Sequence, residues 1–388
     1  MTKINKSATN KNILVNSSTH SWPALSNFNF YSGKNVVVTG HTGFKGSWLT
    51  AWLKLLGANV TGISLDPPTK PSHFETALIH EGILDLRVDI RDANAISESI
   101  STIKPDFIFH LAAQSLVYKA FKEPIDTWQT NVMGTVHILN ALRELKNPCV
   151  TTLITSDKCY ENLEWVWGYR ESDRLGGNDP YSASKASAEL AIHSYVKSYF
   201  SKEQSKVRIV SARAGNVIGG GDWAADRLIP DCIKSWTKNE TAILRNPNST
   251  RPWQHVLEPI GGYLQLALKV SEDSRLHGES FNFGPDPANE YSVLELVSEF
   301  SKHWDKVKWG QSSSVDYQIK ESRLLKLNCD KAAQLIDWRA KLNFAQTVKL
   351  TAEWYKQFFE NPISVKETTN SQITNYSDSL QRKINVNK

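Results

Sequence analysis

Apolar runs and helical patterns alternate along the first half of the chain. The runs are rich in β-branched residues and lack a polar alternation, which is typical of strands buried on both faces of a parallel sheet. They lie at residues 34–40 (KNVVVTG), 59–65 (NVTGISL), 106–113 (DFIFHLAA), 149–154 (CVTTLI) and 207–214 (VRIVSARA). Helical periodicity separates them, as at 47–57, where a terminal glycine is expected to end the helix. Strands that alternate with helices predict an α/β fold with right-handed crossovers.

The same pattern divides the chain into four parts. Residues 1–29 are rich in Asn, Ser, Thr and Lys and are expected to form a disordered tail. Residues 30–215 carry the alternating strands and helices, whereas 216–360 contain Gly-, Trp- and Pro-rich loops between shorter elements, including FNFGPDPANEYS. This second part is predicted to be a smaller α/β lobe, partly interleaved with the first, that closes over a ligand. Residues 361–388 are polar and are expected to form a loosely held tail.

Composition narrows the classes of partner. The net charge of +5 is small for 388 residues, so nucleic acid is not an expected partner. Cys149, Cys159, Cys232 and Cys329 are too scattered for a zinc site or a disulfide framework. No run of about 18 apolar residues and no apolar signal segment occurs, so neither a membrane helix nor secretion is expected. A cytoplasmic protein is therefore the expectation.

A glycine-rich loop, GHTGFKG, follows the first predicted strand. Gly40 permits a tight turn, Gly43 lets the backbone approach a pyrophosphate, and Gly46 lets the helix pack closely on the strand. The helix N-terminus adds positive potential for the phosphates. A glycine turn without a ligand is the alternative, but the position between a strand and a helix favours a dinucleotide site. The predicted fold is therefore a Rossmann-type doubly wound parallel sheet with the smaller C-terminal lobe.

The cofactor prediction extends to the adenosine end of the dinucleotide. Asp89, just after a further predicted strand in the segment LRVDIRD (86–92), is expected to bond the adenine edge. An acidic residue usually holds the ribose at the end of the second strand, yet that position carries Ser64, with Asp66 two residues further on. Lys45 is placed to meet a phosphate, so NAD is predicted and NADP is not excluded. The predicted cofactor-binding residues are Gly40, Thr42, Gly43, Phe44, Lys45, Gly46, Asp66, Asp89, Ile90, Leu111, Ala112, Ala113, Asn131, Tyr181 and Lys185.

The segment YSASK places Tyr181 and Lys185 four residues apart on a predicted helix. Residues at this spacing share a helix face, and an ammonium beside a phenol favours the phenolate and lowers its pKa. Such a tyrosine can take the proton of an alcohol whose carbon gives a hydride to a nicotinamide. A solvated helix edge without function is the alternative. Ser156, at the end of a strand, is expected to bond the same alcohol.

Asp157 and Lys158 follow Ser156 directly. Most strands end in polar loops, so these residues alone prove little, and a loop salt bridge between Asp157 and a neighbour is the alternative to a role in catalysis.

Several motifs resemble those of known families. GHTGFKG, HLAAQ (110–114), TNVMGT (130–135) and YSASK resemble the extended short-chain dehydrogenase/reductases. TSDKCYEN (155–162), WVWGYRESD (165–173), RAGNVIGGGDWAADRLIPD (213–231) and RPWQHVLEP (251–259) resemble the CDP-glucose 4,6-dehydratases of that group, over residues 30–377. The resemblance implies a hydro-lyase that converts CDP-D-glucose to CDP-4-dehydro-6-deoxy-D-glucose by internal hydride transfer through bound NAD. It also implies a place in deoxysugar biosynthesis for surface polysaccharide.

This resemblance gives roles to the candidate residues. Tyr181 would take the proton of the glucose 4-hydroxyl, and the resulting 4-ketone would acidify the C5 hydrogen. Lys158 would remove that hydrogen, where the dTDP-glucose members carry a glutamate, and Asp157 would donate a proton to the departing 6-hydroxyl. The implied substrate-binding residues are Gln114, Asn216 and Arg227 (the last two at the pyrophosphate), with Arg251 and His255 at the nucleotide end.

One segment departs from the family pattern. Where the family usually carries Glu-Ala-His-Tyr, residues 321–324 read ESRL, so Arg323 and Leu324 replace the His and Tyr of the nucleotide pocket. Nucleobase specificity therefore stays open. The resemblance further implies a homodimer, or a homotetramer of paired dimers, built through the helices that flank Tyr181.

Two alternative functions stand beside the dehydratase. Another nucleotide-sugar dehydratase or an epimerase of the same group is the nearer one, although an epimerase needs no acid/base pair after Ser156. The other is a catalytically silent dinucleotide sensor, although such proteins usually lose the tyrosine and lysine that this chain keeps.

Overall fold

The computed structural model describes residues 29–201, 205–286, 290–311 and 324–382. Seven strands form the central sheet in the order β11-β6-β5-β4-β1-β2-β3, and every pair is parallel. They are β1 (Asn35–Thr39), β2 (Asn59–Ser64), β3 (Leu84–Arg87), β4 (Phe107–His110), β5 (Cys149–Ile154), β6 (Val207–Ala214) and β11 (Ser280–Phe283). The strand order changes direction between β1 and β4, because the chain adds β2 and β3 on one side of β1 and β4 on the other. Such a switch point opens a crevice at the carboxyl ends of the two strands. The predicted Rossmann-type α/β fold is confirmed.

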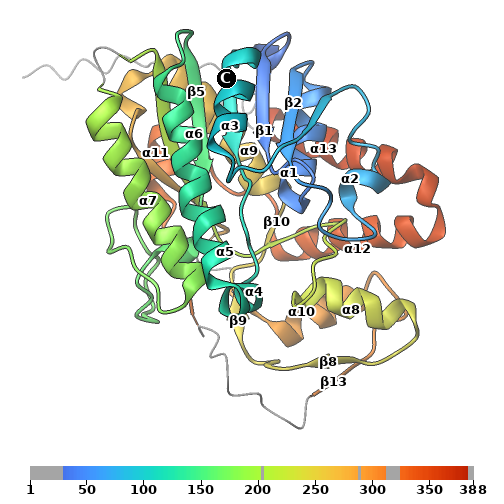
Figure 1. Cartoon of the computed structure of the whole chain (residues 1–388). Helices are drawn as coiled ribbons and strands as arrows, with labels where there is room; N and C mark the ends of the chain where they lie inside the picture. The colour runs from blue at the N-terminus through green and yellow to red at the C-terminus, as the bar shows by residue number, and fades with distance from the viewer. Residues whose placement is uncertain (1–28, 202–204, 287–289, 312–323, 383–388) are drawn as a thin grey trace, which may run out of the picture.

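Helices cover both faces of the sheet (Figure 1). One face carries α3 (Ala93–Ile103), α6 (Gly134–Arg143) and α7 (Pro180–Tyr199), and the other carries α1 (Phe44–Leu55), α9 (Leu257–Glu272) and α13 (Val365–Arg382). The remaining elements of the dinucleotide half are α2 (His73–Thr76), α4 (Val117–Lys122), α5 (Pro124–Trp128), the π-helix η2 (Gln129–Met133) and the 3₁₀-helix η3 (Asp157–Cys159). Among the described residues no helix is long and apolar enough to cross a membrane.

Shorter elements follow β6. They are β7 (Val217–Ile218), α8 (Leu228–Thr237), β8 (Ala242–Leu244), β9 (Thr250–Arg251), β10 (Gln254–His255), η4 (Ser274–Leu276), β12 (Tyr291–Ser292), α10 (Val293–Ser301), β13 (Trp309–Gln311), α11 (Asp330–Leu335), α12 (Phe344–Glu360) and η5 (Pro362–Ser364). Figure 1 shows α8, α10, β8 and β13 gathered at one end of the molecule, where they form a separate group.

Short side chains set the start of the helix that carries the YSASK segment. The Asp179 carboxylate accepts a hydrogen bond from the Ser182 backbone N–H at 3.0 Å, and Pro180 occupies the first turn. Aspartate at the N-cap and proline at the first helical position are both favourable at a helix start. Tyr181 is therefore fixed in the first turn of α7, next to the end of β5.

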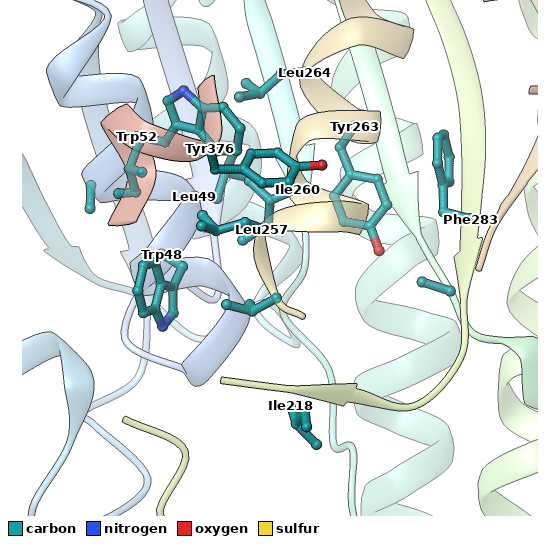
Figure 2. Close-up of a cluster of buried hydrophobic side chains, with 14 of the residues drawn as sticks. Trp48, Leu49, Trp52, Ile218, Leu257, Ile260, Tyr263, Leu264, Phe283 and Tyr376 are labelled. Carbon is teal, nitrogen blue, oxygen red and sulfur yellow. The ribbon is translucent and has the colours of Figure 1, made fainter. Parts of the chain in front are cut away.

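The core on the α1 side of the sheet joins segments from the two ends of the chain (Figure 2). Trp48 and Trp52 on α1 pack toward Leu257 and Ile260 on α9, and the Tyr376 ring of α13 lies edge-on to Trp52 at 5.7 Å between centroids. Full burial of one such side chain stabilises the fold by roughly 1.5–3 kcal/mol. This packing fixes α1, whose N-terminus is the end of the glycine loop.

The expectation of a loosely held C-terminal tail is wrong for the described part of that segment. Residues Val365–Arg382 form the long helix α13, which buries Val365, Ile373, Tyr376 and Leu380 against the core. The buried face of α13 is hard to recognise in the sequence, because it also contains polar residues such as Thr369. Residues 383–388, and residues 1–28 of the predicted N-terminal tail (1–29), lie outside the described residues.

The loop expected around FNFG also differs from the structure. Ser280–Phe283 is the edge strand β11, which pairs in parallel with β6. The strand is only four residues long, alternates polar residues with phenylalanines and is followed by Gly284, so the Gly- and Pro-rich residues after it hide it. A strand from the second half of the chain thus completes the sheet of the first half.

Candidate active site

A cleft of about 2450 Å³ lies at the carboxyl ends of the strands. Its walls come from the glycine loop, the segments after β2, β3, β4 and β5, the start of α7, and residues between 214 and 253. This is the crevice in which ligands bind to open parallel sheets.

The glycine loop is shaped for close backbone approach. Gly40 has a φ of +74°, and a Cβ there would lie 2.7 Å from the Ala112 backbone nitrogen. A Cβ on Gly46 would overlap the carbonyl oxygen of Gly40. Gly43 has extended backbone and caps α1 without a side chain, so the N–H groups of the first turn face the cleft. The loop therefore fits the pyrophosphate of a dinucleotide.

Most of the predicted cofactor residues line the cleft. They are Gly40, Thr42, Gly43, Phe44, Lys45, Gly46, Asp66, Asp89, Ile90, Leu111, Ala112, Ala113, Tyr181 and Lys185. Asn131 is buried and lies outside this lining. Its amide accepts a hydrogen bond from the Gln114 backbone N–H at 2.8 Å and donates to the Ser184 hydroxyl at 2.9 Å. Asn131 thus joins the loop after β4 to α7.

The adenosine end of the cleft holds charges of both signs. The Ser64 hydroxyl bonds to the Thr42 hydroxyl at 2.8 Å, and Asp66, with 91% of its side chain exposed, lies 3.6 Å from the Arg87 Nε. The Asp89 carboxylate pairs with Arg91 at 2.6 Å, and this hydrogen-bonded guanidinium lowers its pKa. A carboxylate is therefore present for ribose hydroxyls, but a guanidinium lies beside it.

Ser156, Asp157 and Tyr181 meet at the end of β5. The Ser156 hydroxyl donates to Asp157 Oδ1 at 2.8 Å and accepts from the Lys158 backbone N–H at 3.2 Å. Tyr181 is hydrogen-bonded to Ser156 and is 7% exposed. Lys185, 6% exposed, lies one helical turn further along α7. The structure thus brings together all five residues predicted for catalysis in one cleft.

Burial dominates the charge states in this cluster. It raises the pKa of Asp157, as expected for an acid, against the opposing effects of Lys158 and Ser156. It lowers the pKa of Lys185 to about 8. Burial also raises the pKa of Tyr181 to about 12, although the bond to Ser156 opposes this effect. The expected lowering of the tyrosine pKa is therefore not found, because solvent exclusion outweighs the attraction of nearby cations.

The predicted substrate residues do not all reach the cleft. Gln114, Asn216, Arg227 and Arg251 line it, whereas His255 is fully buried outside the lining. The Nδ1 of His255 accepts from the Leu257 backbone N–H at 3.4 Å, and burial lowers its pKa to about 3. The Gln114 side chain donates to the Leu116 carbonyl of its own loop at 3.0 Å and to the Thr127 hydroxyl of α5 at 2.9 Å.

The structure adds partners that the sequence patterns did not indicate. Arg227 donates to Asp222 at 2.9 Å and to the Ser115 hydroxyl at 3.2 Å, so it links the segment before α8 to the loop after β4. Asp222 and Arg227 are five positions apart in an irregular loop, so no helix or strand periodicity in the sequence indicates that they pair. In the segment 321–324, which departs from the family pattern, the Leu324 carbonyl accepts a hydrogen bond from the Asn162 side-chain amide at 3.0 Å. Arg323 lies outside the described residues.

The parallel sheet, the glycine loop and the cluster of Ser156, Tyr181 and Lys185 define a short-chain dehydrogenase/reductase with a Rossmann fold. Within this class, residues 37–351 match the family model described as GDP-mannose 4,6 dehydratase. The chain belongs to that family.

Individual relatives agree with this placement. The chain is 45% identical over 332 residues to a CDP-glucose 4,6-dehydratase of Salmonella typhimurium, a match that covers 84% of this chain and 92% of the relative. It is 24% identical to a CDP-paratose 2-epimerase of Salmonella typhi, over 82% of this chain and 98% of that one. Among solved structures, a dTDP-glucose 4,6-dehydratase from Bacillus anthracis in complex with NAD has a TM-score of 0.67 at 23% identity, with 85% and 98% of the two chains covered. A UDP-glucose-4-epimerase from Stenotrophomonas maltophila has a TM-score of 0.72 at 19% identity, with coverages of 84% and 99%, and it supports the fold alone.

Proposed function

We propose that this chain is a CDP-glucose 4,6-dehydratase, a hydro-lyase that forms CDP-4-dehydro-6-deoxy-D-glucose. The observation that carries the proposal is the buried Asp157, hydrogen-bonded to Ser156 beside Tyr181, with Lys158 next in the chain. The 45% identity to the Salmonella typhimurium dehydratase over nearly its whole length supports the choice of substrate.

NAD fits the glycine loop and would be held by Gly40, Gly43, Gly46, Asp66 and Asp89. When bound, it supplies the reversible hydride acceptor that the internal oxidation and reduction of the sugar require. NADP is the less favoured cofactor, because the Asp66 carboxylate would repel a 2′-phosphate.

Tyr181 and Ser156 would hold the glucose 4-hydroxyl between them. Both side chains line the cleft at the end of β5, and the Ser156 hydroxyl donates to Asp157 at 2.8 Å, so its oxygen would be an acceptor for a substrate hydroxyl. Tyr181 takes the hydroxyl proton, and the ammonium of Lys185, one turn away, stabilises the phenolate that forms. Burial raises the pKa of Tyr181 to about 12, so a positive charge beside the phenol would be needed to stabilise the phenolate.

Asp157 and Lys158 would carry out the elimination. Lys158 would take the C5 proton, which the adjacent 4-ketone makes acidic, and the C5–C6 double bond would form as the C6–O bond breaks. Asp157, whose pKa burial raises, gives its proton to the departing oxygen, which leaves as water. Loss of one proton from C5 and one hydroxyl from C6 balances as one molecule of water. The 4-dehydro-6-deoxy product would then require the hydride removed from C4 to be returned to C6 by the bound dinucleotide and a proton to be returned to C5 by Lys158.

Arg227 is the proposed anchor of the substrate pyrophosphate. Asp222 orients its guanidinium at 2.9 Å, and a guanidinium fork matches phosphate oxygens. Asn216 and Arg251 line the same cleft and are proposed to bind the nucleotide, whereas His255 would act only through the packing beneath Trp48.

An exposed apolar surface supports a proposed homodimer. Ile125, Trp128 and Met133 on α5 and η2 are 73%, 40% and 45% exposed, and Leu190 on α7 is 59% exposed. The first three also line a small apolar groove. Apolar side chains gathered on one surface can mark a site where proteins associate.

We also propose a cytoplasmic location. All four cysteines are free thiols, and thiols stay reduced in the cytosol.

An epimerase is the second candidate, favoured by the fold of several solved relatives. A dehydratase and a C4 epimerase differ in their products and in whether the hydrogen at C5 exchanges with solvent. The purified chain is incubated with NAD and CDP-glucose, or dTDP-, UDP- or GDP-glucose, in D₂O, and the sugar is analysed by NMR. A 4-keto-6-deoxy product with deuterium at C5, from CDP-glucose in preference to the others, is expected. A C4 epimer without loss of the 6-hydroxyl would establish an epimerase and refute the dehydratase.

A further inference from the structure

The carboxylate proposed to hold the adenine ribose lies in a turn beyond the end of its strand. β2 ends at Ser64, whose last partner in the sheet is Arg87 on β3. In dinucleotide sites of this kind the acidic residue usually lies at the end of the second strand, where the sheet itself fixes it. Asp66 follows two residues later, so contacts outside the sheet ladder must fix its place.

The Leu65 carbonyl is the point at which this turn is held. It accepts two hydrogen bonds, one from the Thr42 hydroxyl of the glycine loop at 3.1 Å and one from Arg87 Nη1 at 2.8 Å. The Thr42 hydroxyl also bonds to the Ser64 hydroxyl at 2.8 Å. The described residues that line the cleft include Leu65 and Asp66 but not Arg87. Arg87 therefore supports the turn from outside the cleft.

Further contacts fix the direction of the Arg87 guanidinium. Its Nη2 donates to Asp85 Oδ2 at 2.8 Å, and the other carboxylate oxygen of Asp85 bonds to the buried His41 Nε2 at 2.9 Å. The guanidinium carbon lies over the Phe74 ring, 5.3 Å from its centroid. The Nε of Arg87 lies 3.6 Å from Asp66 Oδ1. Each nitrogen of the guanidinium thus faces an oxygen of the protein, which commits this group to the turn.

The two charges at this end of the cleft have opposite effects on a dinucleotide. A carboxylate accepts hydrogen bonds from the ribose hydroxyls and repels a 2′-phosphate, whereas a free guanidinium attracts that phosphate. The Asp66 side chain is 91% exposed, and an exposed ion pair contributes little energy by itself. The contribution of Arg87 to cofactor selection therefore lies in the geometry of the turn rather than in the charge pair.

We propose that Arg87 is a positioning residue for cofactor selection. It fixes the turn after β2 so that Asp66 meets the adenine ribose of NAD, and its contacts withhold its own guanidinium from the 2′-phosphate of NADP. The ribose-binding role of Asp66 in this inference rests on the proposed function. Arg87 then acts through Asp66 and not independently of it.

The test is a double-mutant cycle of cofactor binding. Calorimetry measures the dissociation constants of NAD and of NADP with the full-length chain, freed of cofactor and without a sugar substrate. Asp66→Asn is expected to lower the preference for NAD by about tenfold and Arg87→Met by about fivefold, as the loss of hydrogen bonds of ordinary strength would. In Asp66→Asn/Arg87→Met the preference is expected to equal that of Asp66→Asn alone, because the two residues act as one unit.

Arg87→Lys separates positioning from charge. It keeps a positive charge beside Asp66, but an ammonium cannot reproduce the planar fork that contacts several oxygens at once. It is expected to lose the preference for NAD as Arg87→Met does, and it decides if the methionine variant does not fold. A wild-type preference in Arg87→Lys would overturn the inference. Arg275→Met, which breaks the pair of Arg275 with Asp273 at 2.7 Å on η4, is the matched control and should leave the preference unchanged.

The other outcomes separate this inference from the proposed function. Additive losses in the double variant overturn the inference, because Arg87 would then act independently of Asp66. A stronger preference for NAD in Arg87→Met also overturns it, since the guanidinium would then bind the 2′-phosphate itself. An unchanged preference in Asp66→Asn counts against the ribose-binding role of Asp66 and the inference together. A changed preference in Asp66→Asn with an unchanged one in Arg87→Met counts against the inference alone.

Discussion

Two buried phenols of this chain differ in what their hydroxyls touch. The Tyr181 hydroxyl is hydrogen-bonded to Ser156 at the cleft, whereas the buried Tyr263 hydroxyl on α9 has no hydrogen-bond partner among the described residues. Figure 2 shows the Tyr263 ring beside Phe283, within the apolar core. The two side chains have similar burial but opposite expected roles in activity and stability.

Replacement of these two tyrosines by phenylalanine separates the roles. Tyr181→Phe is expected to lower the rate of ketone formation by about 10²–10⁴-fold, the usual contribution of a general base, with little change in unfolding. Tyr263→Phe is expected to keep the activity and to equal or exceed the wild-type stability, because an unpaired buried hydroxyl is costly. Steady-state rates and urea unfolding of both variants check this. Equal loss of activity in the two variants would contradict the assignment of Tyr181.

At this scale, the sequence predicted residue types and shared helix faces, but not solvent exclusion or side-chain direction. The spacing of Tyr181 and Lys185 correctly placed both on α7 facing the cleft. The same spacing gave the wrong direction for the tyrosine pKa, because burial depends on segments far away in the chain. His255 was chosen by resemblance, yet its side chain lies in the core, since a motif fixes a residue type and not its orientation.

At the scale of elements, one carboxyl joins three segments on the α1 side of the sheet. Glu258 on α9 accepts from the Lys341 and Leu342 backbone N–H groups at 2.8 and 2.6 Å and from the Tyr376 hydroxyl of α13 at 2.7 Å. Burial raises its pKa from 4.5 to about 6, although these bonds oppose the effect. The folded chain therefore binds a proton here more tightly than the unfolded chain does.

This difference predicts a pH dependence of stability. The contribution of Glu258 is fully present below pH 4.5 and is lost as the pH rises through about 6, a fall of about 2 kcal/mol in the free energy of unfolding. Glu258→Gln keeps an acceptor for both backbone groups and is expected to remove this fall. Urea unfolding at several pH values between 4.5 and 7 measures it. The exposed Glu353→Gln serves as the control and should retain the wild-type slope.

Helix α13 supplies a second prediction at this scale. Ile373 is 1% exposed in the core that α13 shares with α1, and Thr374 beside it is exposed. Ile373→Ala is expected to lower the free energy of unfolding by about 2–5 kcal/mol, because it removes buried methyl groups and leaves a cavity. Thr374→Ala is expected to change it by less than about 0.5 kcal/mol. Similar small effects of the two changes would mean that the helix is not docked in solution.

The sequence predicted the strands of the sheet better than the elements that complete it. The runs at β1, β2, β4, β5 and β6 are long and apolar, so their strand character is local. The edge strand β11 and the helix α13 are stabilised by contacts with distant segments and have weak local patterns. Such elements are assigned reliably only once the surface that they cover is known.

At the scale of the whole molecule, the exposed apolar patch on α5 and η2 predicts self-association. Ile125→Asp is expected to dissociate the proposed dimer, because burying an unpaired carboxylate in an apolar interface is costly. Ile363→Asp, at a residue 90% exposed away from that patch, is expected to leave the assembly unchanged. Sedimentation of both variants decides, and a monomeric wild-type chain would refute the dimer.

The contact of α13 with α1 also bears on how the chain folds during its synthesis. The imidazole of His73, which stacks on Trp48, bonds to the Thr369 hydroxyl across 296 positions of the chain. The core behind the glycine loop is therefore complete only after α13 has left the ribosome, although the loop itself is synthesised much earlier. Until then Trp48 and Trp52 lack part of their packing, which makes the nascent chain a natural client for chaperones that shield apolar surface. The residues around the glycine loop are therefore synthesised before the segment that completes the packing behind them.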